Sequence, residues 1–266
     1  CWKAGHMAIV KNAVKQRLRD GKIAAGFGIS RLRSAEIPQI AEACGFHWVF
    51  VDLEHTTMDL DEAGQVCAAA LKTNATAIVR VPEGDITRAT RILDAGAQGV
   101  VFPHVNTVEE AKAFVAACKY PPLGSRSMSY GGPQLEYEAV PPNEAMEGGN
   151  AETLLVMMIE TPTAVENAAA IAAVDGVDCL LVGGSDLSAT MGIPGQYQNA
   201  DFVASIDKVI AAAQSAGVWP GLGGVYDEKL LPGFIEKGMK FLLGGSDMSF
   251  LMAGGKARGK FFNSLD

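Results

Sequence analysis

Residues 154–188, LLVMMIETPTAVENAAAIAAVDGVDCLLVGGSDLS, contain the pattern that decides the fold. The stretch begins with an unbroken apolar run at 154–159, which is typical of a strand buried on both faces of a parallel sheet. A segment of helical composition follows at 161–174, with Pro162 in the first turn, where proline is tolerated. A second apolar run, 179–182, leads into Gly-Gly-Ser-Asp. This order predicts a strand–helix–strand unit with parallel strands.

An acidic residue follows each of these two strands, Glu160 after the first and Asp186 after the second. Neighbouring strands lie about 4.8 Å apart, and parallel strands end at the same edge, so both side chains are within reach of one cation. A lone acid at a strand end can instead cap the next helix, and Asp186 is placed for that role as well. We favour the metal pair because both acids fall at the same end. Oxygen ligands suit Mg²⁺ or Mn²⁺, and Co²⁺ and Zn²⁺ are further candidates.

The alternation of strand and helix continues along the whole chain. Eight apolar runs are each followed by a helical segment, which is the count of an α/β protein with a single-domain (β/α)8 TIM barrel. Segment 120–151 interrupts the rhythm with Pro, Gly, Ser and Glu, and a loop of that length is usually functional or disordered. The predicted strands occupy residues 23–29, 48–51, 77–81, 100–102, 154–159, 179–182, 219–222 and 241–243.

Composition limits the classes of function. The 266 residues carry a net charge of −8 without a long run of one sign, which argues against nucleic acid or an anionic membrane as partner. No apolar segment is long enough to span a bilayer. Five single cysteines without CxxC spacing predict reduced thiols in a cytoplasmic protein. Residues 1–7 have the character of a tag remnant, so the barrel domain is expected at 8–266.

Active sites of such barrels lie at the carboxyl ends of the strands, and polar residues gather there. Asp52 and His55 are expected to form an orienter–base pair, and Arg80 to bind an anionic or carbonyl oxygen. Each has a simpler alternative: Arg80 as a structural bridge between acids, and His55 as a surface residue. For His104, substrate contact and packing are equally supported. The polar set at these strand ends is Asp52, Glu54, His55, Arg80, His104, Glu160 and Asp186.

Two absences narrow the chemistry. No lysine stands at the carboxyl end of a predicted strand, which argues against a Schiff-base aldolase. The chain also lacks a glycine-rich dinucleotide fingerprint and a Walker loop.

Several motifs together resemble the HpcH/HpaI aldolase family of metal-dependent class II pyruvate aldolases. The resemblance implies that Glu160 and Asp186 ligate a divalent ion, that Asp52 and His55 are the acid–base pair, and that Arg80 stabilises the carbonyl and enolate. It also implies a homohexamer, a trimer of dimers in which the last helix, 248–262, is exchanged between subunits. The motifs are VDLEH (51–55), IVRVP (78–82), LDAGAQGVVFPHV (93–105), IET (159–161) and VGGSDLSATMG (182–192).

The expected reaction is reversible aldol cleavage of a 2-keto acid, with pyruvate or hydroxypyruvate as donor and an aldehyde as acceptor. Backbone N–H groups of Gly184, Ser185 and Asp186 are expected to hold the substrate carboxylate. His104, and Arg126 in the 120–151 segment, are the further substrate-binding candidates.

Departures from the family pattern affect the substrate-binding residues rather than the metal ligands. Met158 stands where the family often has Gln, Ser185 lies in a Gly-Gly-Ser-Asp sequence in place of Gly-Pro-Ala-Asp, and Ser127 replaces a glycine. These changes affect the expected substrate more than the reaction class.

Two other functions remain open. An acyl-CoA lyase of the malyl-CoA or citryl-CoA type shares the barrel and the acid pair, but needs a basic surface for the CoA phosphates. Arg126 is the main candidate for that surface. A non-catalytic metal-binding barrel is the second alternative, because this fold hosts many functions.

Overall fold

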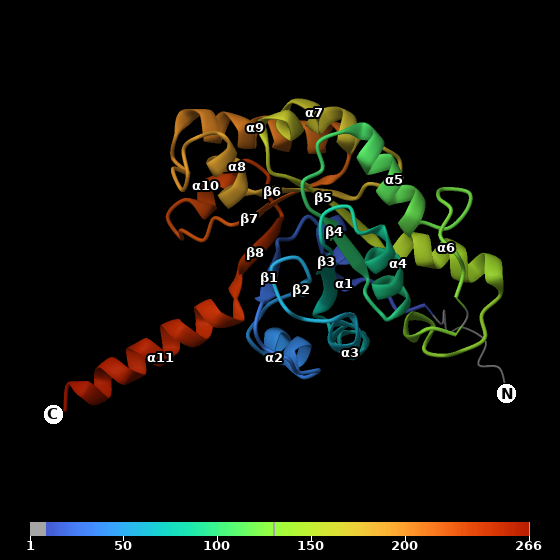
Figure 1. Cartoon of the computed structure of the whole chain (residues 1–266), viewed down its shortest axis with the longest axis horizontal. Coiled ribbons are helices and arrows are strands. Elements are labelled where there is room, and N and C mark those ends of the chain that lie inside the picture. The colour runs from blue at the N-terminus through green and yellow to red at the C-terminus, as the bar shows by residue number, and fades with distance from the viewer. Residues whose placement is uncertain (1–8, 130, 266) are drawn as a thin grey trace.

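The computed structural model describes residues 9–129 and 131–265 and shows a closed barrel of eight parallel strands in chain order (Figure 1). The predicted TIM barrel is confirmed, and each predicted strand overlaps an observed one. The predicted tag remnant, 1–7, lies outside the described residues. The strands are β1 (Ala24–Ile29), β2 (Trp48–Asp52), β3 (Thr76–Arg80), β4 (Gly99–Phe102), β5 (Leu154–Ile159), β6 (Cys179–Gly183), β7 (Trp219–Gly223) and β8 (Phe241–Ser246).

Helices connect the strands and cover the outside of the barrel (Figure 1). Several begin at a residue that favours a helix start: Asp59 and Thr107 each form a capping box with the glutamate three residues on. The helices are α1 (Ala13–Arg19), α2 (Ile37–Ala43), α3 (Leu60–Ala70), α4 (Ile86–Asp94), α5 (Val108–Cys118), α6 (Pro142–Glu152), α7 (Pro162–Ala172), α8 (Gly184–Thr190), α9 (Ala200–Ala216), α10 (Leu231–Glu236) and α11 (Asp247–Asn263), with a 3-10 turn at Pro133–Leu135.

Two apolar layers result from the alternation of side chains along the strands. Val49 and Val51 point outward and pack under the helices, whereas Phe50 points into the barrel. Inside, Trp48 stacks on Phe241 with ring centroids 4.2 Å apart. The interior is therefore a packed core, and small molecules can bind only at its ends.

A glycine in β1 makes room for the largest interior side chain. A Cβ on Gly26 would lie 2.2 Å from the indole of Trp48. The indole N–H donates to the carbonyl of Ala24, 3.1 Å away, so the ring is fixed against β1. Any larger residue at position 26 would displace it.

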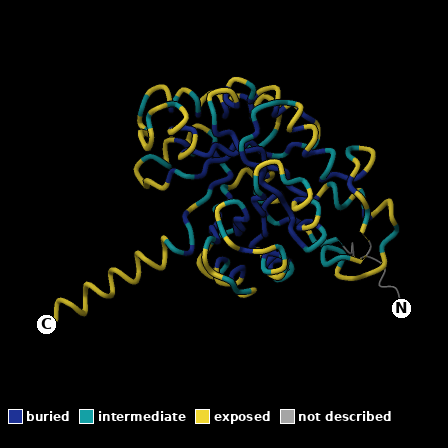
Figure 2. The backbone as a smooth tube through the Cα atoms, in the orientation of Figure 1, coloured by how far each residue is buried: buried dark blue, intermediate teal, exposed yellow. Residues whose placement is uncertain are grey.

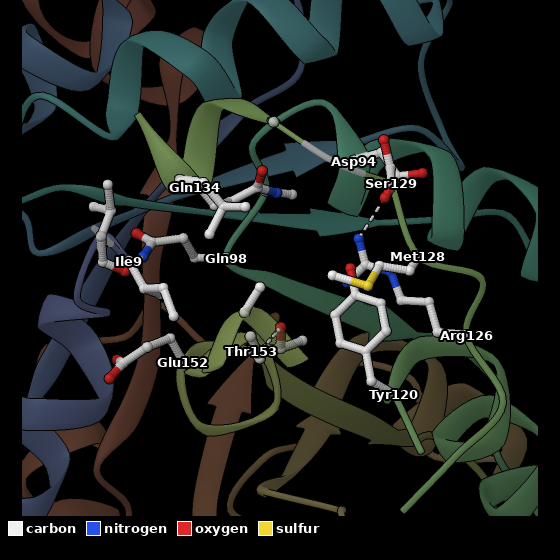
Figure 3. Close-up of a pocket in the computed structure, with 16 residues that line it drawn as sticks. Ile9, Asp94, Gln98, Tyr120, Arg126, Met128, Ser129, Gln134, Glu152 and Thr153 are labelled. Carbon is white, nitrogen blue, oxygen red and sulfur yellow. Dashed lines mark hydrogen bonds and ion pairs between the residues drawn. The ribbon is translucent and has the colours of Figure 1, made fainter. Parts of the chain in front are cut away.

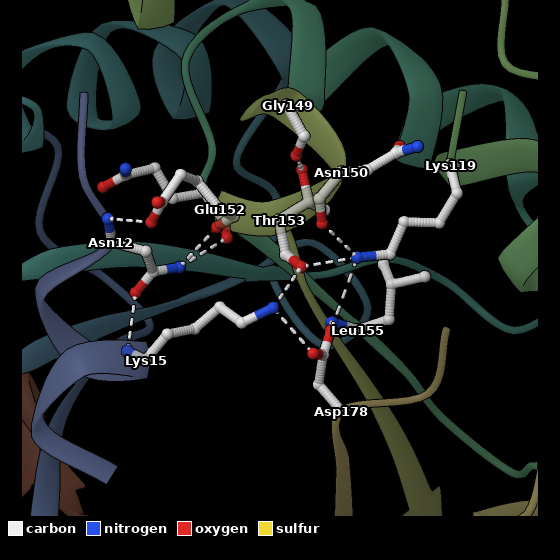
Figure 4. Close-up of polar contacts among 10 residues, drawn as sticks. Asn12, Lys15, Lys119, Gly149, Asn150, Glu152, Thr153, Leu155 and Asp178 are labelled. Carbon is white, nitrogen blue, oxygen red and sulfur yellow. Dashed lines mark hydrogen bonds and ion pairs between the residues drawn. The ribbon is translucent and has the colours of Figure 1, made fainter. Parts of the chain in front are cut away.

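The amino-terminal face of the barrel is closed by α1 and a buried polar network (Figure 4). Val14 and Leu18 of α1 join the interior cluster. Asp178 accepts from Lys15 Nζ at 2.7 Å and lies 3.5 Å from Lys119 Nζ. Lys119 also donates to the carbonyls of Asn150 and Thr153 at 2.9 and 2.7 Å. These contacts tie α1, the end of α5, the end of α6 and the residue before β6 together at this face.

The last helix departs from the body of the molecule. Helix α11 extends away from the barrel (Figure 1), and nearly all of its residues are exposed (Figure 2). Within the described residues, no helix has the length and apolar character needed to cross a membrane.

Candidate active site

The carboxyl ends of β2 and β3 place Asp52 beside Arg80, which are paired in the sheet register. Arg80 Nε donates to Asp52 Oδ1 at 3.0 Å, and Arg80 Nη2 donates to Oδ2 at 2.8 Å. The guanidinium also lies over the ring of Phe50, 5.1 Å from its centroid. Burial alone would lower the pKa of Arg80. The bond to Asp52 and the charges of Asp52, Glu54 and Glu160 outweigh burial and raise this pKa, so the cation is fixed and permanent.

The structure does not bring the His55 imidazole to Asp52. Asp52 Oδ1 accepts the backbone N–H of His55 at 3.3 Å and that of Glu54 at 3.0 Å. The His55 ring is turned away, with a side chain 63% exposed, and its Nε2 lies 3.6 Å from Glu54 Oε2. Asp52 therefore orients Arg80 and the loop backbone, and His55 faces a different carboxylate.

Glu54 belongs to the predicted polar set at the carboxyl-terminal opening of the barrel, called the mouth from here on, but the sequence predicts no role for it. Its side chain is 11% exposed and lies among three basic groups. Arg80 Nη1 is 3.2 Å from Oε2, and His104 Nε2 is 3.9 Å from Oε1. The sequence signal that could identify Glu54 is its position in the DLEH motif, between the two predicted site residues Asp52 and His55.

Glu160 is almost fully buried at the end of β5, at 1% exposure. Its Oε2 accepts the backbone N–H of His104 at 2.8 Å. A Cβ on residue 183 would lie 2.5 Å from Oε1, so only glycine leaves space for this carboxylate. Burial, together with the charge of Asp186, raises the pKa of Glu160, while His104 and Arg80 act against that rise. Such a carboxylate gains from a nearby cation.

His104 is held in an unusual backbone conformation at the end of β4. Its φ is 53°, a left-handed value that costs free energy for a residue other than glycine. The conformation turns its N–H toward Glu160 and brings Nδ1 within 3.4 Å of Glu160 Oε2. His104 therefore lies in the mouth, where the sequence placed it.

Two copies of Gly-Gly-Ser-Asp end in aspartates with opposite surroundings. Asp247 is buried and accepts five hydrogen bonds, three of them from the backbone of Ser30, Arg31 and Leu32. Asp186 is exposed in the first turn of α8, and no described residue donates a hydrogen bond to its carboxylate. The capping interpretation of Asp186 is therefore not supported. Its oxygens are free to bind a cation.

The donor set fits a divalent cation with few protein ligands. No cluster of three or more His, Cys, Asp or Glu side chains suited to a metal occurs among residues 9–129 and 131–265. Glu160 and Asp186 supply carboxylate oxygens only, and Mg²⁺ commonly binds through one or two carboxylates, with water and substrate completing its shell. Gly184 and Ser185 begin α8 beside them. The first N–H groups of a helix have no partner within it.

Arg126 lies at the wrong end of the barrel for the predicted substrate contact. It donates to Asp94 Oδ1 at 2.6 Å, stacks 4.7 Å from the ring of Tyr120, and lines a cavity of about 50 Å³ with Gln98 and Thr153 (Figure 3). Gln98 and Thr153 immediately precede β4 and β5, so this cavity is at the amino-terminal face. The 120–151 segment follows a helix and returns to a strand, which places it on that face in any such barrel.

Lys119 has a lowered pKa, but it follows α5 and so lies at the face of the barrel opposite the mouth. Burial lowers the pKa of Lys119 to about 8, while Asp178 partly counteracts the effect. Its ammonium group is surrounded by the acceptors of the amino-terminal face (Figure 4). Lys119 is therefore not placed for Schiff-base chemistry at the mouth.

Tyr226, which is not among the predicted site residues, follows β7 at the same end of the barrel. Burial raises its pKa, against a hydrogen bond with the backbone of Gly224 and the charge of Arg80. Its position just after a strand is the signal that could have identified it.

Several known proteins are similar to this chain in sequence and in fold. A model of the family described as HpcH/HpaI aldolase/citrate lyase matches residues 30–253. The 4-hydroxy-4-methyl-2-oxoglutarate aldolase cghB of Chaetomium globosum is 39% identical over 222 residues, covering 83% of this chain and 82% of that protein. The hydroxypyruvate/pyruvate aldolase of Sagittula stellata is 34% identical over 252 residues, covering 95% and 98%. The crystal structure of an HpcH/HpaI aldolase from Desulfitobacterium hafniense DCB-2 superposes with a TM-score of 0.89 at 29% identity, covering 95% of this chain and 97% of that one.

Proposed function

The chain belongs to the HpcH/HpaI aldolase/citrate lyase family, and from this premise we propose that it is a metal-dependent class II aldolase. It would form and cleave the carbon–carbon bond between a 2-keto acid and an aldehyde, with pyruvate or hydroxypyruvate as donor. The names of the two aldolase relatives above support this class of donor.

The observation that carries the proposal is the pairing of Glu160 with Asp186. One carboxylate is buried against Gly183, and the other accepts no hydrogen bond from any described residue. We propose these two as the ligands of Mg²⁺ or Mn²⁺. When bound, the cation would act as a Lewis acid toward the keto and carboxylate oxygens of the substrate.

The remaining residues would act on the substrate directly. Arg80, held in place by Asp52, would stabilise the negative charge that develops on the enolate oxygen. The first N–H groups of α8, at Gly184, Ser185 and Asp186, would hold the substrate carboxylate. His55 is exposed at the mouth and would accept the proton of the aldol hydroxyl during cleavage.

The acceptor aldehyde would meet residues of the mouth rather than the 120–151 segment of the same chain. His104, at the end of β4, and Tyr226, after β7, are the polar side chains we propose for that contact. Met158, which departs from the family pattern, packs in the barrel interior two residues before Glu160. Its apolar side chain would lie beneath the substrate.

We also propose a homohexamer in which α11 is exchanged between subunits. This helix exposes Leu251, Met252, Phe261 and Phe262, which would be costly for an isolated chain in water. Packing on a second subunit would cover these side chains. The prediction of a cytoplasmic enzyme is retained, with Cys44, Cys67, Cys118 and Cys179 all free thiols.

Among the described residues, the placement of Arg126 argues against the acyl-CoA lyase. Its main candidate for phosphate binding, Arg126, lies at the opposite face and is already paired with Asp94. The retained charge pairs and the unpartnered Asp186 also argue against a non-catalytic scaffold.

The proposal is tested by retro-aldol cleavage of 4-hydroxy-4-methyl-2-oxoglutarate, with released pyruvate detected by lactate dehydrogenase. Cleavage should require added Mg²⁺ or Mn²⁺, disappear with chelator, and be lost in Asp186→Asn. Glu83→Gln removes an exposed charge after β3, with which no described residue forms a hydrogen bond or an ion pair, and should retain activity. Undiminished cleavage with chelator and in Asp186→Asn would refute the metal role.

A further inference from the structure

We propose that Asn106, in the loop after β4, is a positioning residue for Glu160 and that it acts through the backbone of His104. Asn106 is not among the predicted site residues. The proposal rests on the proposed function in one respect, since it takes Glu160 as a ligand of the divalent cation. It goes further by assigning the side chain that sets the direction of this carboxylate.

The Glu160 carboxylate accepts one hydrogen bond from the described part of the chain, and the donor is the backbone N–H of His104. This N–H lies 2.8 Å from Oε2. The other oxygen, Oε1, packs against Gly183, where an added Cβ would lie 2.5 Å away. A carboxylate oxygen has two lone-pair positions. The backbone therefore fills one position of Oε2, and the direction of the second position depends on how His104 is held.

His104 presents its N–H to Glu160 only in a strained conformation. Its φ of 53° is left-handed, and a residue other than glycine keeps such a value only where the surrounding structure fixes it. The side chain of Asn106 supplies one such contact, because its Nδ2 donates to the carbonyl of His104 at 2.8 Å. The N–H and the carbonyl of His104 are then both bound, which fixes the peptide groups on either side of its Cα.

Hydrogen bonds close a ring that contains Asn106 and Glu160. The hydroxyl of Thr161 donates to Asn106 Oδ1, and Thr161 directly follows Glu160 in the chain. The two bonds of His104, its N–H to Glu160 and its carbonyl to Asn106, complete the ring. The orientation of the amide follows from chemistry, because the carbonyl of His104 can only accept a hydrogen bond. Asn106 thus joins the loop after β4 to the loop after β5.

The backbone of Asn106 is anchored separately from its side chain. Glu110, in the first turn of α5, accepts the backbone N–H of Asn106 at 2.8 Å. Asn167 of α7 donates its Nδ2 to the carbonyl of Asn106 at 2.7 Å. Both bonds lie outside the ring, so they hold the loop in place when the Asn106 side chain is replaced. Asn167 therefore offers a comparison, since it bonds to the same loop without belonging to the ring.

Opening the ring would release His104 from its strained conformation and turn its N–H away from Glu160. Groups that hold metal ligands in place typically account for roughly 10–100-fold in metal affinity. Asn106→Leu keeps about the size of the side chain but none of its hydrogen bonds, and should weaken Mn²⁺ binding about tenfold. Thr161→Val opens the ring at the next bond and should have a similar effect.

The test measures the dissociation constant of Mn²⁺ from the electron paramagnetic resonance signal of the free ion, so it needs no turnover. Asn106→Leu and Thr161→Val should each raise this Kd about tenfold, and the double variant should raise it no further, because both act through one ring. A Kd for Asn106→Leu equal to that of the wild type would overturn the proposal.

Two control variants make the same chemical change elsewhere. Asn143→Leu alters an exposed residue of α6 that forms no hydrogen bond or ion pair with a described residue, and should leave the Kd of Mn²⁺ unchanged. Asn167→Leu removes a bond to the same loop outside the ring, and should change this Kd by less than about twofold. A loss in Asn167→Leu as large as that in Asn106→Leu would overturn the proposal.

A glycine at position 104 separates this positioning from a general loss of structure. Glycine adopts a left-handed φ without steric cost, so a chain with His104→Gly no longer needs the Asn106 side chain to hold that conformation. In this background, adding Asn106→Leu should raise the Kd of Mn²⁺ by less than about twofold. A full tenfold loss there would overturn the proposal, even where the single variants lose stability.

The outcomes separate this proposal from the proposed function. If the wild type cleaves a 2-keto acid in a metal-dependent way but Asn106→Leu binds Mn²⁺ as tightly as the wild type, the aldolase function stands and the positioning by Asn106 is overturned. If the expected changes in Kd are found but the wild type cleaves no 2-keto acid, the aldolase function fails and the positioning by Asn106 stands.

Discussion

The same Asp→Asn substitution can be made in each of the two Gly-Gly-Ser-Asp segments, and we expect it to affect stability in one segment and activity in the other. Asp247→Asn and Asp186→Asn make the same chemical change at matching positions, the first after β8 and the second after β6. Because Asp247 is saturated with donors and Asp186 has none, we expect the first change to destabilise the fold and the second to abolish catalysis.

The magnitude follows from counting donors at Asp247. Oδ2 accepts the N–H groups of Ser30, Arg31 and Leu32 at 3.0, 2.7 and 2.7 Å, and Oδ1 accepts from Ser30 Oγ and the N–H of Met248 at 2.6 and 2.7 Å. In its best orientation an asparagine keeps the first three bonds and strands the N–H of Met248, at a cost of about 1–3 kcal/mol. The three retained bonds lose their charge assistance, which adds about 1–2 kcal/mol. We expect a total loss of about 2–5 kcal/mol.

Urea unfolding at pH 7, followed by circular dichroism, measures this difference, and the pyruvate assay measures activity. Asp186→Asn should change the unfolding free energy by no more than about 0.5 kcal/mol, as surface substitutions usually do. Burial would raise the pKa of Asp247, but its hydrogen bonds lower it overall. Its contribution is therefore present above the unfolded-state value of about 3.9 and is lost as the pH falls below it. Equal destabilisation by the two substitutions would refute the distinction.

Three further predictions follow from the same geometry. Mg²⁺ at about 100 times its dissociation constant should stabilise the wild type by about 2.7 kcal/mol in thermal or urea unfolding, and should not stabilise Asp186→Asn. Arg80→Lys keeps the charge but cannot bind Asp52 through two parallel bonds, so kcat/KM should fall about a hundredfold; an unchanged value would contradict the role given to the guanidinium. Lys119 has a pKa of about 8 in the fold and about 10.4 when unfolded, so the native state releases its proton first. As the pH rises between those two values, the free energy of unfolding of the wild type should therefore increase relative to that of Lys119→Met. If the two free energies of unfolding changed with pH in parallel, this prediction would be refuted.

The fold could be predicted because buried parallel strands leave a strong signal. Runs such as 154–159 are apolar throughout, and the observed β5 has the same bounds. Helix α6 was missed because its sequence, PNEAMEGGNAE, contains two adjacent glycines that disfavour a helix. Tertiary contacts override that preference: the side chain of Asn150 bonds the backbone of Tyr120 in both directions, at 2.7 and 3.0 Å. Such contacts cannot be read from local composition.

The sequence places the candidate residues at one end of the barrel, but it does not show which of their side chains contact each other. The barrel topology alone places Asp52, His55, Arg80 and Glu160 at one end, because each ends or follows a strand. Which carboxylate contacts which base depends on side-chain rotation, and the structure does not bring the His55 ring to Asp52. The structure places Arg126 apart from the other candidates, because a segment between a helix and the next strand lies at the opposite face of the barrel.

The charge balance of the mouth gives an electrostatic reason for metal dependence. Four carboxylates, those of Asp52, Glu54, Glu160 and Asp186, lie at the mouth with one guanidinium, that of Arg80, and their full ionisation leaves three more negative charges than the guanidinium balances. A 2-keto acid is itself an anion, so this mouth repels it until positive charge is added. The raised pKa of Glu160 reflects the same excess of negative charge, because burial and Asp186 both oppose its ionisation. A divalent cation between Glu160 and Asp186 would lower that pKa and reduce the excess to one. The cation would thus be needed to admit the substrate as well as to activate it.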